Sequence, residues 1–358
     1  MILSGITIAS LTSTGLFDKV EEAKTKTSEK QKEENLRLDE YRDAIAEQVT
    51  GNKPEKPFEG STVAQAIEYE KVLNLSDKTE LTDANGNKIV VPAGFKIISN
   101  SDTNNATTVD KGIVIEDATG KDTNGSQFVW IPVGSIKKVD GTSTTIDLNR
   151  YTFTNNGIPN AQNESVITDE NDANSKFQEL SKEEIDEFKT SANTNEGFYV
   201  GRYESRTVNA RNSSDDELKT LTVKKSDNIY NYVTQRQAKE QSKSMYSSAI
   251  KSDLINSYAW DTTVLFLQTF GDNDKYSRQN STTSEYLING TDDDKQCNVY
   301  DMAGNIREWT TEECSDLEYP CTNRGGIANN SNLYTSNRFS SSSTASVAHI
   351  GFRTILYF

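Results

Sequence analysis

Side chains suited to redox, metal or general-base chemistry are scarce in this chain of 358 residues, which has one histidine and three cysteines. The lone His349 excludes a metal site built on two histidines and leaves little for general-base catalysis. Cys314 and Cys321 flank a loop that contains a proline, so they could form a small disulfide outside the cytosol. Cys297 would then be a buried thiol. We expect no metal site from these residues.

The composition is acidic and polar. Acidic residues outnumber basic ones by 54 to 38, which gives a formal net charge of -16. Such a charge repels phosphate backbones and anionic lipids, so we expect no nucleic-acid partner. Only 34% of residues are hydrophobic, but 15 tyrosines and 13 phenylalanines can fill a core wrapped in polar loops. Abundant Asp and Asn leave a structural calcium ion open as a cofactor, although no EF-hand spacing is present.

The first 50 residues are predicted to form one long helix with two different parts. Residues 1–16 carry no charge and are too short to span a bilayer, which takes about 20 apolar residues. They are typical of the end of a longer apolar helix. Residues 24–35 contain almost nothing apolar, which indicates a solvated stalk, whereas residues 36–49 would suit a helix packed on its own domain better than residues 18–35 would. Residues 51–60, rich in Gly, Pro and Lys, are a linker.

The apolar run Gly5-Ile6-Thr7-Ile8-Ala9, followed by a charged helix that opens with Glu21-Glu22-Ala23-Lys24, resembles the N-terminal helix of type IV pilin-like proteins of Gram-positive bacteria. In those proteins the apolar half lies in a membrane or a filament core. The resemblance implies an extracellular or cell-surface protein that is anchored to a membrane or pilus in its full-length form. The charged leader of such helices is absent from this numbering, so we expect the natural chain to begin further upstream.

Residues 61–358 are predicted to form one domain of mixed helices and strands. An Asn-Gly pair inside residues 81–91 is the strongest local signal, because it favours a tight hairpin turn. Residues 134–178, mostly Asn, Asp, Ser and Thr, are expected to be a long loop or insertion. Other strands are expected within residues 94–98, 112–115, 128–133 and 197–204, and helices within residues 61–75, 181–189, 234–245 and 254–270.

Six motifs in this domain occur in a familiar order. They are Phe128-Val-Trp-Ile-Pro-Val, Gly197-Phe-Tyr-Val-Gly-Arg-Tyr-Glu, Trp260-Asp261, Asp301-Met-Ala-Gly-Asn-Ile-Arg-Glu-Trp309, Arg324-Gly-Gly and Gly351-Phe-Arg353. Each motif is weak alone, but together they resemble the formylglycine-generating enzyme, or sulfatase-modifying-factor, family over residues 86–358. The resemblance implies an α+β, C-type-lectin-like fold with small antiparallel sheets, two helices and much irregular loop.

The last three motifs make sense as a structural frame. A Gly304-Asn305 turn would separate two large aromatic side chains that can be buried, and the later glycines would allow close backbone approach. Arg324 and Arg353 could satisfy buried carbonyl groups or pair with Glu308. The residues expected in this frame are Asp301, Gly304, Asn305, Trp309, Arg324, Gly325, Gly326, Arg338, Gly351, Phe352 and Arg353.

The catalytic chemistry of the family depends on two cysteines that bind copper and oxidise a substrate cysteine. By the resemblance, the corresponding positions here are Asn330 and Thr335, so the thiol pair is missing. Without thiolates there is no soft-metal site of that type, and we predict that the chain is not an enzyme. One alternative is a family enzyme with altered chemistry, including a Ser-His-Asp arrangement that uses His349.

A second branch of the same fold comprises variable proteins diversified by retroelements, which present a C-terminal segment on a lectin-like frame. Residues 327–350 resemble such a segment, because they lie between the Gly-Gly and Gly-Phe-Arg motifs and are rich in Asn, Ser and Tyr. The predicted partner is a protein or glycan on another cell, phage or host surface. The predicted ligand-binding residues are Ile327, Asn329, Asn330, Asn332, Tyr334, Asn337, Phe339, Ser341, Ser343 and Ser346. The remaining alternative is a minor pilin that acts only in assembly through its N-terminal helix.

Overall fold

The computed structural model describes residues 61–70, 78–119, 121–162, 166–168, 175–246, 250–281, 294–330 and 332–358. The chain divides into two compact units, Met1–Lys56 and Pro57–Phe358, and every described residue belongs to the second. The predicted N-terminal helix (residues 1–50) and linker (residues 51–60) lie outside the described residues, as does the resemblance to pilins. Among the described residues, no helix is long and apolar enough to cross a bilayer.

The central sheet has six strands, and every pair of neighbours is antiparallel. Its order is β16 (Lys251–Leu254), β21 (Thr354–Tyr357), β13 (Gly197–Gly201), β6 (Gln127–Pro132), β5 (Val114–Asp117) and β4 (Phe95–Ile98). The four residues from Phe128 to Ile131 are fully buried, as expected for aromatic and β-branched side chains in a central strand. Trp130 packs edge-on against Tyr199 with ring centres 4.9 Å apart. This sheet forms the main core.

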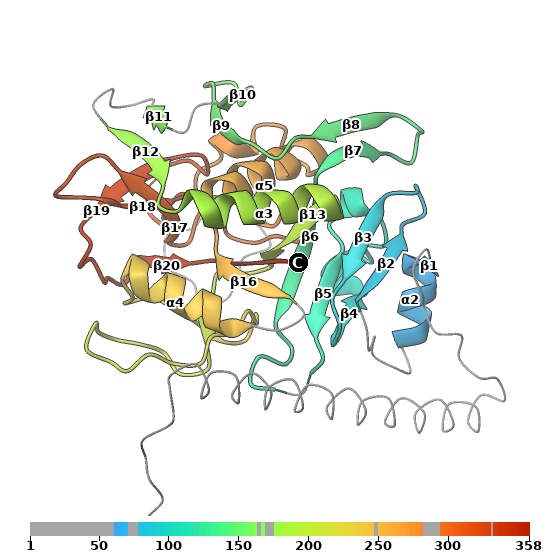
Figure 1. Cartoon of the computed structure of the whole chain (residues 1–358), viewed down its shortest axis with the longest axis horizontal. Coiled ribbons are helices and arrows are strands. Elements are labelled where there is room, and N and C mark those ends of the chain that lie inside the picture. Colours follow the sequence, from blue (N-terminus) through green and yellow to red (C-terminus); the bar gives the residue numbers. More distant parts are fainter. Residues whose placement is uncertain are drawn as a thin grey trace, which may run out of the picture. The chain divides into compact units, whose positions relative to one another are not determined.

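The second sheet carries most of the C-terminal motifs. Its path is β11 (Val166–Thr168), β12 (Lys176–Glu179), β17 (Arg307–Cys314), β18 (Cys321–Arg324) and β19 (Arg338–Ser341). A further strand, β20 (Ile350–Phe352), pairs with β17 in parallel. Figure 1 shows β17, β18, β19 and β20 grouped on the left, on the side opposite β2–β5. The candidate segment therefore runs from just after β18 to the start of β20, and both strands belong to this sheet.

The remaining strands are short. A three-stranded sheet contains β1 (Ser61–Thr62), β2 (Thr79–Thr82) and β3 (Lys88–Val91), with the predicted Asn-Gly turn between the last two. The other two-stranded pairs are β7 (Gly134–Lys137) with β8 (Ser143–Ile146), β9 (Arg150–Phe153) with β10 (Pro159–Gln162), and β14 (Arg206–Thr207) with β15 (Asn228–Ile229). The expectation of a long loop over residues 134–178 is therefore wrong, because its described residues include β7 to β12.

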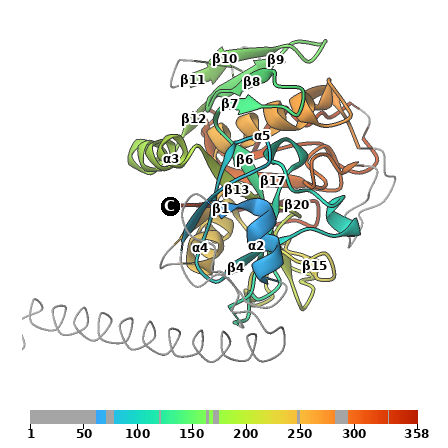
Figure 2. The ribbon, with the colours of Figure 1, turned by 90° about the vertical axis from the view of Figure 1, so that its right-hand side faces the viewer.

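Four α-helices lie in the described part of the chain: α2 (Val63–Glu70), α3 (Lys182–Asn195), α4 (Gln235–Met245) and α5 (Ser257–Phe270). The last three begin at side-chain caps, from Ser181, Thr234 and Asn256, that each accept a hydrogen bond from the first turn. The two helices implied by the family resemblance were thus too few, although the residue patterns placed all four. Figures 1 and 2 show α2 beside the strands β2–β4, where it contacts β4. The predicted α+β class is confirmed.

Candidate functional site: the C-terminal segment and its frame

The turn within the Asp301–Trp309 motif is held by a buried carboxylate. Asp301 and Asn305 both adopt left-handed backbone conformations, with φ of 61° and 60°. The Asn305 side chain donates a 2.7 Å hydrogen bond to Glu204, and the backbone N–H of Ile306 donates a 3.3 Å bond to the same carboxylate. Burial, together with the nearby Asp301 carboxylate, raises the pKa of Glu204 well above its usual value. Two hydrogen bonds to the buried Glu204 therefore hold this turn in place.

Arg353 ties the motif to the central sheet. Its Nε donates to the Glu308 carboxylate at 2.9 Å, and its other nitrogens donate to the carbonyls of Gly201 at 2.8 Å and Tyr300 at 2.9 Å. All of these groups are buried. The expectation that Arg353 pairs with Glu308 and satisfies carbonyls is confirmed.

Arg324 has different acidic partners from the one expected. It pairs with Asp261 of α5 at 2.6 Å and with Glu312 of β17 at 3.2 Å, not with Glu308. It also donates to the backbone carbonyls of Ser336 at 3.1 Å and Asn337 at 3.0 Å. One buried guanidinium thus joins a helix, a strand and the middle of the candidate segment.

Arg338 completes this ionic network from within the segment. It reaches Asp261 at 2.6 Å and Glu312 at 3.0 Å, and Arg150 also pairs with Glu312 at 2.9 Å. Burial opposes ionisation of Glu312, yet Arg338, Arg324 and Arg150 together lower its pKa to about 2. The assignment of Arg338 to the frame agrees with this geometry.

Gly326 lies where two backbones cross. A Cβ atom there would come within 2.0 Å of the Ala303 carbonyl oxygen, a distance that no real Cβ contact shows. Two residues later, the backbone N–H of Ala328 donates to the carbonyl of Asn305 at 2.9 Å. The start of the candidate segment is therefore fastened directly to the turn of the frame.

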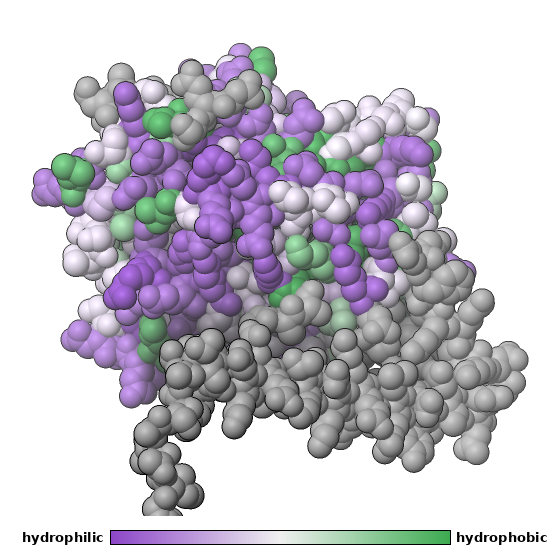
Figure 3. Space-filling view, in the orientation of Figure 1, coloured by the Kyte–Doolittle hydropathy of each residue, from purple (hydrophilic) through white to green (hydrophobic). Residues whose placement is uncertain are grey.

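The candidate segment divides into outward and inward positions. Asn329, Asn330, Asn332 and Ser343 are exposed. In contrast, Thr335 is fully buried, and its hydroxyl donates to the carbonyl of Tyr276 at 2.8 Å. The other predicted ligand-binding residues are half-buried, namely Ile327, Tyr334, Asn337, Phe339, Ser341 and Ser346. On the face shown in Figure 3, apolar residues are scattered among hydrophilic ones.

Some of the half-buried residues are occupied within the fold. The Asn337 side chain accepts a 2.6 Å hydrogen bond from the backbone N–H of Tyr334, which closes a turn. Ser341 accepts a 2.9 Å bond from the Asn323 side chain on β18. The strongest candidates for ligand contact are therefore the exposed asparagines and Tyr334, while binding by any of these residues stays a prediction.

Two arginines lie over aromatic rings of the segment: Arg278, which belongs to none of the motifs, and Arg307, which belongs to the Asp301–Trp309 motif but was not assigned to the frame. The guanidinium of Arg278 is 5.3 Å from the ring centre of Tyr334, and that of Arg307 is 5.1 Å from the ring centre of Phe339. Arg278 also donates to Asn155 at 2.7 Å, at the tip of the β9–β10 hairpin. This hairpin tip thus lies beside Tyr334. The sequence indicates only that arginines and aromatic residues are present, because the two members of each pair are far apart in the chain.

The cysteines do not provide the chemistry of the family enzymes. Cys314 and Cys321 are free, and the strand register places Glu313 opposite Cys321, so Cys314 points to the other face. The predicted disulfide is therefore wrong. Burial raises the pKa of Cys321 to about 11 and that of the half-buried Cys297 to about 12, which disfavours a reactive thiolate.

The positions that correspond to the copper-binding cysteines do not fit a soft metal. Asn330 is exposed, and the Thr335 hydroxyl is buried against a backbone carbonyl, so neither offers a thiolate. Among the described residues, no three His, Cys, Asp or Glu side chains are grouped so that they could hold a metal ion. Whether a structural calcium ion binds, which the composition left open, stays untested.

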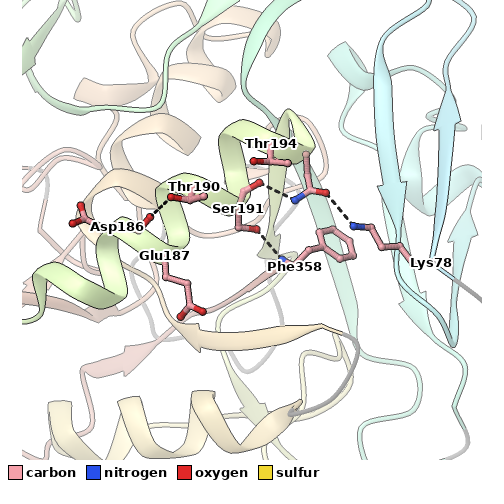
Figure 4. Close-up of a pocket in the computed structure, with 8 residues that line it drawn as sticks. Lys78, Asp186, Glu187, Thr190, Ser191, Thr194 and Phe358 are labelled. Carbon is pink, nitrogen blue, oxygen red and sulfur yellow. Dashed lines mark hydrogen bonds between the residues drawn. The ribbon is translucent and has the colours of Figure 1, made fainter.

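An open hollow of about 530 Å³ lies along α3, and no residue of the candidate segment lines it. Figure 4 shows Lys78 pointing toward the ring of Phe358, whose centre is 4.4 Å from the Lys78 ammonium group. The backbone N–H of Phe358 donates to Ser191 at 2.9 Å. Lys78, Ser191 and Phe358, which line the hollow, are thus engaged in contacts within the protein.

A comparison with known protein families shows to which family the chain belongs. The model of the sulfatase-modifying factor enzyme 1-like domain matches residues 115–357. The chain belongs to this family. The domain has a C-type-lectin-like fold, as the six ordered motifs predicted.

Two solved structures resemble this sulfatase-modifying-factor domain distantly. Variable protein 1 of Treponema denticola has a TM-score of 0.35 and 10% identity, and the match covers 66% of this chain and 98% of that one. The crystal structure of CarF has a TM-score of 0.30 and 12% identity, with 64% and 98% covered. No curated protein gives a significant match. At these values the neighbours add nothing about function, so the function must be argued from the residues.

Proposed function

We propose that this sulfatase-modifying-factor domain is a binding module that presents its C-terminal segment for recognition of a protein or glycan. The observation that carries the proposal is the division of the segment into buried positions that hold the fold and exposed positions that do not. Thr335 and Arg338 are built into the fold, whereas Asn329, Asn330 and Asn332 are exposed and take no part in the buried ionic network. Within the described part of the chain, the Asn330 side chain accepts only a local 3.0 Å hydrogen bond, from the backbone N–H of Asn332.

The chemistry of the exposed residues suits recognition. Asparagine amides both donate and accept hydrogen bonds, and tyrosine adds a large amphipathic contact area at low entropic cost. Arg278 lies over the ring of Tyr334 and limits its freedom before any ligand binds. Amides around an ordered aromatic ring are a reasonable surface for a neutral polar ligand.

The proposed module is not an enzyme. The side chains at the positions of the family's cysteine pair lack thiols, and burial raises the pKa of the Cys297 and Cys321 thiols, which makes these two poor nucleophiles. Oxygen consumption with a cysteine-containing peptide and copper would contradict this part of the proposal. That reaction would favour a family enzyme with altered chemistry instead.

We further propose that the exposed positions are those that a retroelement would diversify. Changes at Asn329, Asn330 and Asn332 alter the surface without touching the buried ionic network. We place the protein at the cell surface, held by its N-terminal helix. A minor pilin would instead lose its activity when residues 1–50 are deleted and keep it when the exposed asparagines are replaced.

The test is binding to an array of defined glycans and to intact bacterial cells by the domain and by a variant with Asn329, Asn330, Asn332 and Tyr334 changed to alanine. We expect the variant to lose at least about tenfold in affinity, because the central contacts of an interface carry most of its energy. Its melting temperature should change by only a few degrees, since three of the four side chains are exposed.

A matched control replaces the exposed Asn160, Gln178 and Thr194, which lie outside the segment, with alanine. The control should bind as the unaltered domain does. If the control loses binding and the segment variant keeps it, the recognition site lies elsewhere. Asn337 is left unchanged in both proteins, because its side chain closes a turn.

A further inference from the structure

The turn between β17 and β18 presents a leucine almost completely to solvent. Leu317 is 97% exposed, more than any other large hydrophobic residue in the described part of the chain, and Tyr319 is 42% exposed. Single exposed apolar residues are ordinary on protein surfaces. This turn, however, combines two of them with a fixed backbone and an unbalanced charge. Because burial of a leucine side chain is favourable, a partner that covers the turn would gain affinity from it.

The backbone of the turn is held by its own hydrogen bonds. The Asp316 carboxylate accepts one from the backbone N–H of Glu318 at 2.9 Å and one from that of Tyr319 at 3.3 Å. At the base of the turn, the N–H of Cys314 donates to the carbonyl of Pro320 at 2.7 Å. The leucine is thus displayed by an ordered loop, so docking would cost little ordering entropy.

Acidic side chains surround the leucine. Asp316 and Glu318 flank it and are exposed, and Glu313 is half-buried near the base of the turn. Glu318 accepts a 3.1 Å hydrogen bond from the neighbouring tyrosine hydroxyl, and no cation pairs with any of these acids in the described part of the chain. The exposed Lys176 of β12 is joined to the base of the turn by a 2.8 Å backbone hydrogen bond. Among the described residues at this turn, three acids therefore face one base.

The turn leaves the second sheet at the same end as part of the candidate segment. Cys321 opposite Ser341 is the last pair of the β18–β19 ladder. The turn that precedes β18 and the residues that follow β19 therefore begin next to each other. Ser343 and Thr344 in that stretch are exposed. A partner on the turn could extend onto this serine-rich part of the segment.

We propose that the β17–β18 turn is a docking point for a partner protein that has an apolar pocket bordered by lysine or arginine side chains. Leu317 fills the pocket, as apolar anchors do at interfaces, and Asp316 and Glu318 complement the basic border. A membrane is a poorer fit, because anionic lipids repel acidic side chains and the apolar tip is small. No residue of the turn belongs to residues 327–350, so this surface goes beyond the proposed recognition by exposed asparagines.

The experiment uses a short synthetic helical peptide with leucines on one face and lysines on the other, and a second peptide with glutamates in place of the lysines. Titration of the protein is followed by fluorescence anisotropy and by amide chemical shifts. We expect saturable binding of the lysine peptide, with shift changes centred on residues 313–320, and much weaker binding of the glutamate peptide. Leu317→Ser should weaken binding of the lysine peptide about tenfold, because one leucine is no longer buried.

The matched control is Val139→Ser. Val139 is 89% exposed on the turn between β7 and β8, but its neighbours Lys137 and Lys138 are basic. This variant should bind the lysine peptide as the unaltered protein does. Glu318→Gln should weaken binding about threefold and lower its sensitivity to salt. The variant with the exposed asparagines changed to alanine should bind the peptide normally, so failure of the recognition proposal is distinguishable from failure of this one.

Leu317 and Glu318 are exposed, so these variants should fold normally, and unfolding curves check this. The proposal is overturned if the lysine peptide does not bind, if the glutamate peptide binds equally well, or if Val139→Ser weakens binding as much as Leu317→Ser does. Binding to phosphatidylcholine vesicles that is lost in Leu317→Ser would also overturn it, in favour of a membrane.

Discussion

Arg324→Met should lower the free energy of unfolding by about 3–5 kcal/mol, as expected when one partner of a buried ionic network is removed. Arg324 is fully buried, and without it Asp261 and Glu312 would keep their burial but lose a shared cation. Two carbonyls at the entry to β19 would also lose their donor. Urea denaturation monitored by tryptophan fluorescence measures the loss.

The matched control for this change is Arg236→Met. Arg236 is 82% exposed on α4 and pairs with Glu240 at 3.5 Å, so its replacement should change stability by less than about 0.5 kcal/mol. If both variants lose the same free energy of unfolding, the buried network stabilises the fold no more than an exposed ion pair does.

The pH dependence gives a second signature of the same network. The pKa of Glu312 is lowered to about 2 in the folded state, so its ionic stabilisation is complete above its ordinary pKa and lost as the pH falls toward 2. Loss of Arg324 removes one of the cations that lower this pKa. The stability difference between the unaltered domain and Arg324→Met should therefore be full at pH 6 and shrink between about pH 4.5 and 2.

Gly326→Ala should be destabilising by about 3 kcal/mol, because the added Cβ would lie 2.0 Å from the Ala303 carbonyl oxygen. Relief requires the backbone of the turn to move, since the obstructing atom belongs to the main chain. Hydrogen exchange should accelerate at residues 301–306 and 326–330 together, because these two stretches are bonded to each other. Denaturant unfolding and exchange mass spectrometry report the two effects.

Gly141→Ala separates a steric clash from ordinary backbone strain. Gly141 has a φ of +82°, but no atom from a more distant part of the chain lies within 4 Å of the place that a Cβ would occupy. Its replacement should therefore be destabilising by only about 1 kcal/mol. The explanation for Gly326 is contradicted if its variant is no less stable than the Gly141 variant, or if exchange changes in only one of the two stretches.

Much of the fold could be read from local patterns. The Asn-Gly hairpin, the helices that begin near Ser181 and Thr234, and the buried strand that ends at Pro132 all depend on neighbouring residues. The frame could be recognised because its motifs occur in a fixed order. Arg353 could even be matched with Glu308, since both belong to these motifs.

What could not be predicted depends on pairings between distant residues. Nothing in the sequence indicates that Arg324 and Arg338 share Asp261, because a helix far from the segment has to deliver that carboxylate. The disulfide was predicted from spacing alone, whereas a register shift in the β17–β18 pair places Glu313 opposite Cys321. The polar strands β7 to β12 lack long apolar runs, so their pattern could not be told from a loop.

The central claim is that the C-terminal segment contains positions that hold the fold and separate positions left for recognition. The most direct measurement is a saturation scan of residues 327–349, displayed on yeast and sorted for resistance to protease. Most substitutions at Asn332 and Ser343 should leave resistance unchanged, because these side chains are exposed. Substitutions at Asn329 and Asn330 should lower it only slightly, because Asn329 has a left-handed backbone with φ of 68° and Asn330 accepts one local hydrogen bond. Most substitutions at Thr335 and Arg338 should abolish it. Equal sensitivity across the segment, or tolerance at the two buried positions, would contradict the claim.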